Sequence, residues 1–182
     1  MRRALLLFAL GFLPLGAPAQ TTSPDSKSVS EPEFNEVFYR LDAGTLMPLE
    51  HQNTGTTHVS MGFSMKGTIE IPGGKSPVRF RAGERLEFVV RSGLSAAQDP
   101  SSAYHLRVLS IKKDKRVLLI MTVKGRPFGA TAKTGSALGE LPLEFTRYGA
   151  ASVRATTASL PPGEYAVGLG IPGQAVFCFG VD

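Results

Sequence analysis

The sequence predicts an all-β protein, built as an antiparallel β-sandwich with an extra N-terminal β-hairpin. Apolar and polar side chains alternate along many short segments, which is the period of a half-buried strand. Turn signals recur at roughly eight- to twelve-residue intervals. Glycine (20) and proline (13) are plentiful and tryptophan is absent. No segment longer than a few residues has the period of a helix.

The first residues have the three regions of a secretory signal peptide. Arg2 and Arg3 form a short positive start, residues 4–15 are apolar, and residues 17–19 (Ala-Pro-Ala) form a small-residue cleavage site. The apolar run is too short for a spanning helix, and no second run of spanning length follows. We expect residues 1–19 to be removed and the protein to be exported, to the periplasm or outside the cell. The alternative is an anchor that stays attached.

Residues 20–33 are rich in Ser, Thr, Pro and charge, and this composition predicts a disordered linker. Loss of residues 1–19 leaves 18 basic against 15 acidic residues, a net charge of +3. That charge favours solubility but does not indicate a nucleic-acid partner. The remaining length suits one domain with its own core.

Residues 34–56 predict the N-terminal β-hairpin, with strands at 36–41 and 46–51 around a four-residue turn. Pro48 cannot donate to a strand ladder, so the second strand should lie at a sheet edge. An isolated hairpin is barely stable in water. This pair therefore either joins the main sandwich or docks elsewhere through the aromatic pair Phe38-Tyr39.

Residues 57–182 predict the main β-sandwich domain. The internal glycines of its first segment, Gly67 among them, mark a bend or a bulge. The Gly-rich stretch 124–140 interrupts the strands and is either a functional loop or a neutral insertion. The expected strands lie at 57–71 (one kinked or two short), 78–82, 86–91, 104–111, 116–123 (apolar on both faces and central), 141–146, 152–157, 165–169 and 175–181.

Residues 160–169 carry the most specific structural signal. A Pro-Pro-Gly corner precedes Tyr165, and Gly163 should take the positive φ of a type II turn. A buried phenol needs a partner, which an upstream carbonyl can supply. The pattern resembles the tyrosine corner of immunoglobulin-like and fibronectin-III-like β-sandwiches, and this resemblance implies an immunoglobulin-like fold. It covers these residues alone, and Val167 stands where antibody domains have a cysteine.

Cys178 is the only cysteine, so no intramolecular disulfide can form. It lies in residues 175–181, which are apolar on both faces, and we expect a buried small hydrophobe. The alternatives are a nucleophile or an intermolecular bridge.

The histidines His51, His58 and His105 do not have the spacing of a metal site, and we expect them to be exposed. No G-x-S-x-G nucleophile elbow is present. The basic hairpin tip at 112–116 either keeps an edge soluble or contacts acidic polymers or lipid head groups, and is too small to predict nucleic-acid binding. We assign no catalytic, cofactor-binding or metal-binding residue.

The sequence thus favours an exported, non-enzymatic β-sandwich that binds a protein or a cell-surface ligand, such as another envelope protein or a surface polymer. The contact surface would be an edge strand, the Gly-rich stretch or the N-terminal hairpin. A structural subunit of an envelope assembly and a secreted hydrolase are the alternatives. The sequence carries no signal for an oligomeric state.

Overall fold

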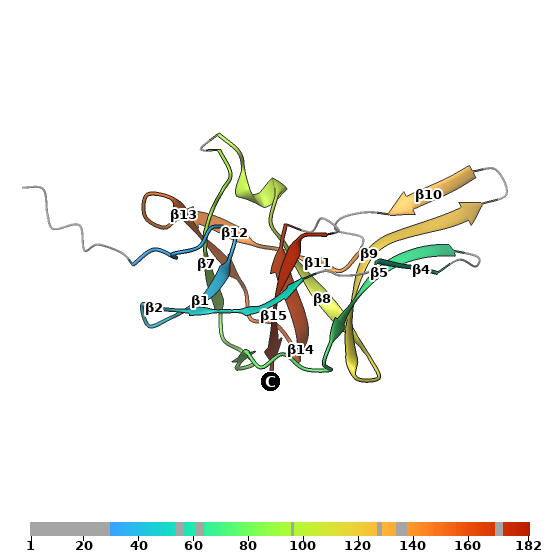
Figure 1. The fold of residues 1–182 in the computed structure, drawn as a ribbon, viewed down its shortest axis with the longest axis horizontal. Helices are drawn as coiled ribbons and strands as arrows, with labels where there is room; N and C mark the ends of the chain where they lie inside the picture. Colours follow the sequence, from blue (N-terminus) through green and yellow to red (C-terminus); the bar gives the residue numbers. More distant parts are fainter. Residues whose placement is uncertain are drawn as a thin grey trace, which may run out of the picture.

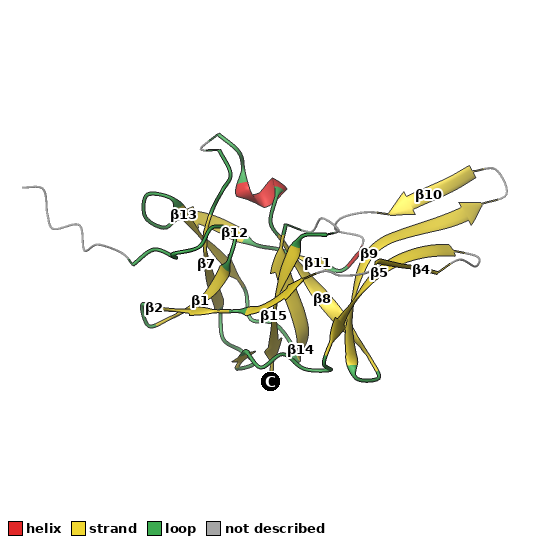
Figure 2. Cartoon of the chain, viewed as in Figure 1, coloured by secondary structure: helices red, strands yellow, loops and turns green. Residues whose placement is uncertain are grey.

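The structure is a computed structural model of the chain that describes residues 30–53, 57–60, 64–95, 97–126, 129–133, 138–169 and 173–182. Within these residues the regular elements are β-strands, apart from the short 3-10 helix η1 (Pro100–Ser102) and the single 3-10 residue Leu138. The strands form two sheets (Figure 1, Figure 2). Neighbouring strands are antiparallel, except that β6 (Arg79–Phe80) runs parallel to β15 (Ala175–Val181). The predicted all-β, antiparallel class is confirmed. The predicted signal peptide and residues 20–29 of the predicted linker lie outside the described residues.

The smaller sheet has five strands, with β7 at its centre and β12 and β2 at its edges. Pro48 ends β2, so the predicted edge position of this strand is confirmed. In sheet order the strands are β12 (Glu144–Arg147), β13 (Ser152–Thr157), β7 (Leu86–Arg91), β1 (Phe38–Asp42) and β2 (Thr45–Pro48).

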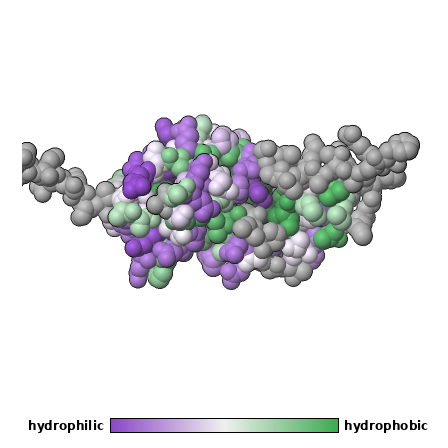
Figure 3. Space-filling view, turned by 90° about the horizontal axis from the view of Figure 1, so that it is seen from above, coloured by the Kyte–Doolittle hydropathy of each residue, from purple (hydrophilic) through white to green (hydrophobic). Residues whose placement is uncertain are grey.

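The larger sheet has ten strands and curls, so that β4, β5, β9 and β10 form an arm at the right of Figure 1. On the face shown in Figure 3, polar surface dominates the half that holds the five-stranded sheet, and apolar surface gathers toward the arm. The main strand order of the larger sheet is β3 (Glu50–Asn53), β15 (Ala175–Val181), β14 (Gly163–Gly168), β8 (His105–Lys112), β9 (Lys115–Arg126), β5 (Ser64–Pro72) and β4 (Thr57–Ser60). Three strands pair beside this path: β6 (Arg79–Phe80), β10 (Gly129–Lys133) and β11 (Glu140–Leu141).

Strands β14 and β15 are covered on both faces. One face packs on the five-stranded sheet in the main core, with Tyr165, Phe177 and Phe179 among its residues. The other face packs on β5 and β9 in a second core that contains Cys178. Burial leaves the thiol 0% exposed and raises its pKa to about 12, so the predicted buried small hydrophobe is confirmed. The curl of the sheet explains why residues 175–181 are apolar on both faces.

Segment 57–71 forms two strands, which is one of the two predicted alternatives, with the expected irregularity between Gly67 and Thr68. Two other predicted segments differ from the structure. Segment 141–146 was predicted as one strand, but Pro142 interrupts it because proline has no amide to donate. Its two halves become β11 and β12 in different sheets. The expectation that 124–140 is a break was wrong in part, because β9 continues into it and β10 pairs with β9. Residues 134–137 lie outside the described residues.

The predicted N-terminal hairpin forms as β1 and β2 and joins the main fold, which is the first of the two predicted alternatives. Strand β1 pairs with β2 on one side and β7 on the other. The predicted second strand divides at the buried Leu49, after which β3 crosses to pair with β15 in the larger sheet. Phe38 lies in the main core, so it is not a docking residue. Glu31 and Pro32, which fall in the predicted linker, bond to the fold.

Tyr165 has the predicted corner bond. Its hydroxyl donates to the carbonyl of Pro161 at 2.7 Å, and its ring stacks on Phe179 with the centroids 5.5 Å apart. The positive φ expected for Gly163 was wrong. Gly163 already pairs with Val181 as the first residue of β14, and strand pairing requires an extended backbone.

Charged side chains are buried where the arm meets the body. The guanidinium of Arg116, 1% exposed, binds both carboxylate oxygens of Glu50 at 2.5 and 2.7 Å. It also donates to the carbonyls of Pro72 and Gly73, each at 2.9 Å. The sequence placed Arg116 in a solvated hairpin tip, which was wrong. Pairing compensates the large cost of burying this charge.

The chain of buried charges continues through Glu164, which lies 3.9 Å from Arg116 and is 2% exposed. Glu164 accepts from the amide of Ser76 at 2.8 Å and pairs with Arg79, which in turn holds the carboxylate of Asp182. A Cβ at Gly180 would overlap the Arg79 guanidinium, so glycine alone leaves room for this pair. The network joins β3, β6, β9 and β14.

Replacing Tyr165 by Phe should lower the free energy of unfolding by about 1–2 kcal/mol, because the Pro161 carbonyl loses its buried donor. Urea denaturation measures the change. An unchanged midpoint would remove the structural role assigned to the corner bond.

Replacing Arg116 by Met should lower the free energy of unfolding by roughly 3–5 kcal/mol, because the carboxylate of Glu50 would lose its cation and Glu164 would keep only Arg79. The matched control is Lys115→Met, since Lys115 is the next residue along but forms an exposed pair with Glu70. Denaturation should show a much smaller change for the control. Equal effects in the two variants would contradict the assignment.

Candidate functional site

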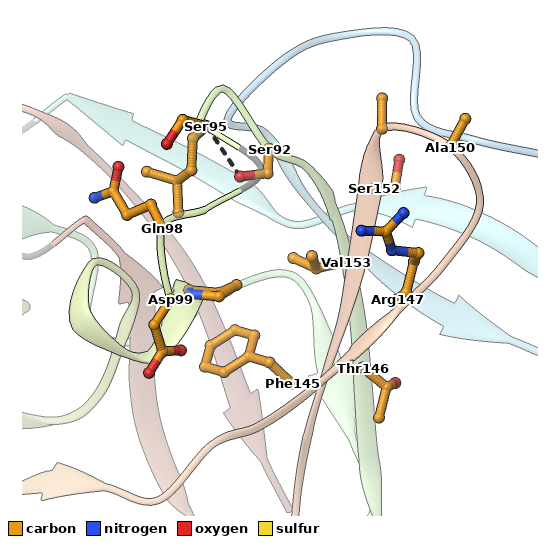
Figure 4. Close-up of a pocket in the computed structure, with 13 residues that line it drawn as sticks. Ser92, Ser95, Gln98, Asp99, Phe145, Thr146, Arg147, Ala150, Ser152 and Val153 are labelled. Atoms are coloured by element: carbon orange, nitrogen blue, oxygen red, sulfur yellow. Dashed lines mark hydrogen bonds between the residues drawn. The ribbon is translucent and has the colours of Figure 1, made fainter.

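A groove of about 450 Å³ opens between the β7–β8 connection, which carries η1, and the β12–β13 hairpin (Figure 4). Its apolar lining includes Leu94, Phe145 and Val153, and its polar lining includes serines from both sides. The exposed Arg147 has a guanidinium with no hydrogen-bond or ion-pair partner among the described residues. The groove thus combines apolar contact area with a free positive charge, as ligand sites commonly do.

Two further cavities lie along the same edge of the molecule. One, of about 400 Å³, shares Phe145 with the groove and is lined also by Tyr104 and Glu140. The other, of about 360 Å³, is lined by Glu144 and Thr156 among others. Each of the three cavities is lined by at least one residue of β12, so they lie around this one strand.

Strand β12 is the edge of the five-stranded sheet and pairs with β13 alone within the described part of the chain. An edge strand presents unpaired backbone donors and acceptors along one side. Glu144 and Arg147, both exposed, stand at its two ends, and such charges discourage non-specific pairing.

One wall of the groove is fixed by Glu36. Its carboxylate accepts from the Tyr104 hydroxyl at 2.9 Å and from the amide of Gly93 at 2.5 Å. The Tyr104 hydroxyl also bonds to Ser92, 3.0 Å away, and Ser92 accepts from the amide of Leu94. Burial raises the pKa of Tyr104, so the phenol stays protonated as a donor. Glu36 has a φ of 61°, which is uncommon for a residue other than glycine, and these bonds hold it there.

The structure does not bring the predicted histidines into one pocket. His51 and His58 are exposed, as expected, and His51 packs on the ring of Phe177. His105 was expected to be solvated, but its Nδ1 lies 2.5 Å from the carboxylate of Glu140, because β11 pairs alongside β8. In the ranges that the structure describes, no three His, Cys, Asp or Glu side chains converge as metal ligands would.

Sequence reasoning did not find the groove. Phe145 belongs to an alternating segment and has the pattern of an ordinary strand residue, while Glu36 and Tyr104 lie far apart in the chain. The chain matches no family model and no curated protein. Among the described residues, no helix has the length and apolar character needed to cross a bilayer.

Replacing Tyr104 by Phe should lower the free energy of unfolding by about 1–3 kcal/mol, because Glu36 and Ser92 lose their shared partner in a partly buried site. Hydrogen exchange at the Gly93 amide should also accelerate. Tyr148→Phe is the control, since this buried ring packs under Arg154 and its hydroxyl has no bond in the described structure. Unchanged exchange at Gly93 would show that the hydroxyl does not hold this wall.

Proposed function

We propose that the mature chain is an exported, non-enzymatic binding protein that takes up an extended segment of a partner protein along β12. The observation that carries this proposal is the position of β12, an edge strand with cavities on both sides. In binding by strand addition, the backbone supplies affinity and pockets for alternate side chains supply specificity. At this edge, β12 offers an unpaired backbone and the cavities beside it offer pockets for side chains.

The groove's chemistry suggests what the partner segment carries. Phe145 lines two cavities and offers contact to apolar side chains in both. The unpaired guanidinium of Arg147 favours an acidic group near the end of the strand. We therefore expect an extended segment with apolar side chains and at least one carboxylate.

The polar groups at the groove support binding more than hydrolysis. Ser92 and Ser152 in the groove, and Ser101 in the neighbouring cavity, bond to a phenol or to carboxylates that organise the loops. A serine hydrolase instead needs a hydroxyl poised against a base. The three hydroxyls named above have a structural role.

The finer fold and the location belong to the same proposal. The Tyr165–Pro161 bond supports an immunoglobulin-like sandwich, since this bond has the form of the tyrosine corner. The signal-peptide pattern of residues 1–19 supports export to the periplasm or beyond.

The test uses a library of linear peptides displayed on phage and selected against residues 20–182. Selected peptides should shift the backbone amide resonances of residues 144–147. Thr146→Arg, which places a long charged side chain on an exposed edge-strand residue that lines the groove, should weaken binding about tenfold or more. Thr45→Arg is the control, because Thr45 is an exposed residue on β2, the opposite edge of the same sheet. Failure to select peptides, or binding that ignores Thr146→Arg, would contradict the proposal.

A further inference from the structure

The turn at residues 149–152, between β12 and β13, binds a carboxylate from a distant part of the chain. The amides of Ala150 and Ala151 donate to Glu31 at 2.7 and 3.1 Å, and the hydroxyl of Ser152 donates at 2.5 Å. Three converging donors form a concave anion site of the kind made by successive backbone amides. These bonds, that of Ser152 foremost, lower the pKa of Glu31, so its carboxylate is ionised at neutral pH.

The turn is shaped for this group. Gly149 has a φ of +93°, and a Cβ there would lie 2.6 Å from an oxygen of the Glu31 carboxylate. Glycine therefore provides both the backbone conformation and the space for the approach. Arg91 adds favourable charge and donates to the carbonyl of Pro32, next to Glu31.

The N-terminal segment that carries Glu31 also holds the opposite wall of the groove, through Glu36. Glu36 accepts from Gly93 and Tyr104, and a Cβ at Gly93 would lie 2.8 Å from its oxygen. Each carboxylate thus sits against a glycine. The residues that they hold, at 150–152 and 92–94, line the groove or adjoin its lining. Figure 4 shows the pale-blue N-terminal segment beside the turn that carries Ala150.

We propose that the turn at 149–152 is a carboxylate-binding site filled by the chain's own Glu31, and that residues 30–36 form a strap that sets both walls of the groove. The site for the carboxylate stands on its own geometry, whereas the effect on the groove rests on the proposed function. Loss of the Glu31 carboxylate would release the strap and loosen the wall that carries Ser152.

Chemical rescue tests the site. Glu31→Ala should speed hydrogen exchange at the amides of Ala150 and Ala151, and added acetate should restore protection in a saturable way. Acetate binds more weakly than the tethered side chain because it lacks the effective concentration that the chain provides. Chloride at equal ionic strength should not substitute. Glu33→Ala is the matched control, since Glu33 lies on the same segment, is exposed and has no bonded partner among the described residues.

The outcomes separate the carboxylate site from the strap's effect on the groove. Unchanged exchange in Glu31→Ala, or equal effects of acetate and chloride, would overturn the carboxylate site. Peptides selected on the wild-type protein should bind Glu31→Ala more weakly, and acetate should restore their affinity. Rescue of the amides without any effect on peptide affinity would overturn the strap's control of the groove. Rescue in a protein that binds no peptide at β12 would instead leave the site standing and count against the proposed function.

Discussion

The pairing of the buried cation Arg116 with carboxylates is the interaction on which the shape of this protein depends. Arg116 lies on β9, where the curled part of the larger sheet turns away from the body. It binds Glu50 on β3 and approaches Glu164 on β14. A buried charge tolerates little displacement, because its partners must stay within hydrogen-bond distance. The curl of the sheet is thereby fixed relative to β14 and β15, and the second core closes between them.

That arrangement gives the molecule a centre that is buried on both faces and a separate, exposed edge. Strands β14 and β15 are packed on both sides, and their side chains are almost entirely buried. The groove and its neighbouring cavities lie away from this centre, around an edge strand and two connections. Recognition commonly uses loops carried on a rigid scaffold. Here the loops bond to carboxylates of the N-terminal segment, in addition to the contacts that Leu94, Phe145 and Val153 make with the main core.

Whether a sequence prediction was confirmed depended on how far apart in the chain the interacting residues lie. The Tyr165 bond spans four residues, and local pattern was enough to predict it. The β8–β9 hairpin and the closing strand β15 were predicted for the same reason. The division of 141–146 between two sheets, the Glu31 site and the Glu36 cluster each depend on residues far apart in the chain. Nothing in the local pattern distinguishes such a glutamate from a solvated one.

The sequence by itself determined the all-β class, the corner at Tyr165 and the burial of Cys178, because alternation, turn chemistry and apolar runs act over a few neighbouring residues. The tertiary structure alone decided which charges are buried, which strand lies at the edge beside the groove, and where Glu31 and Glu36 bind. Those features arise from contacts between segments as much as 121 residues apart, whose meeting depends on how the sheets curl and pack.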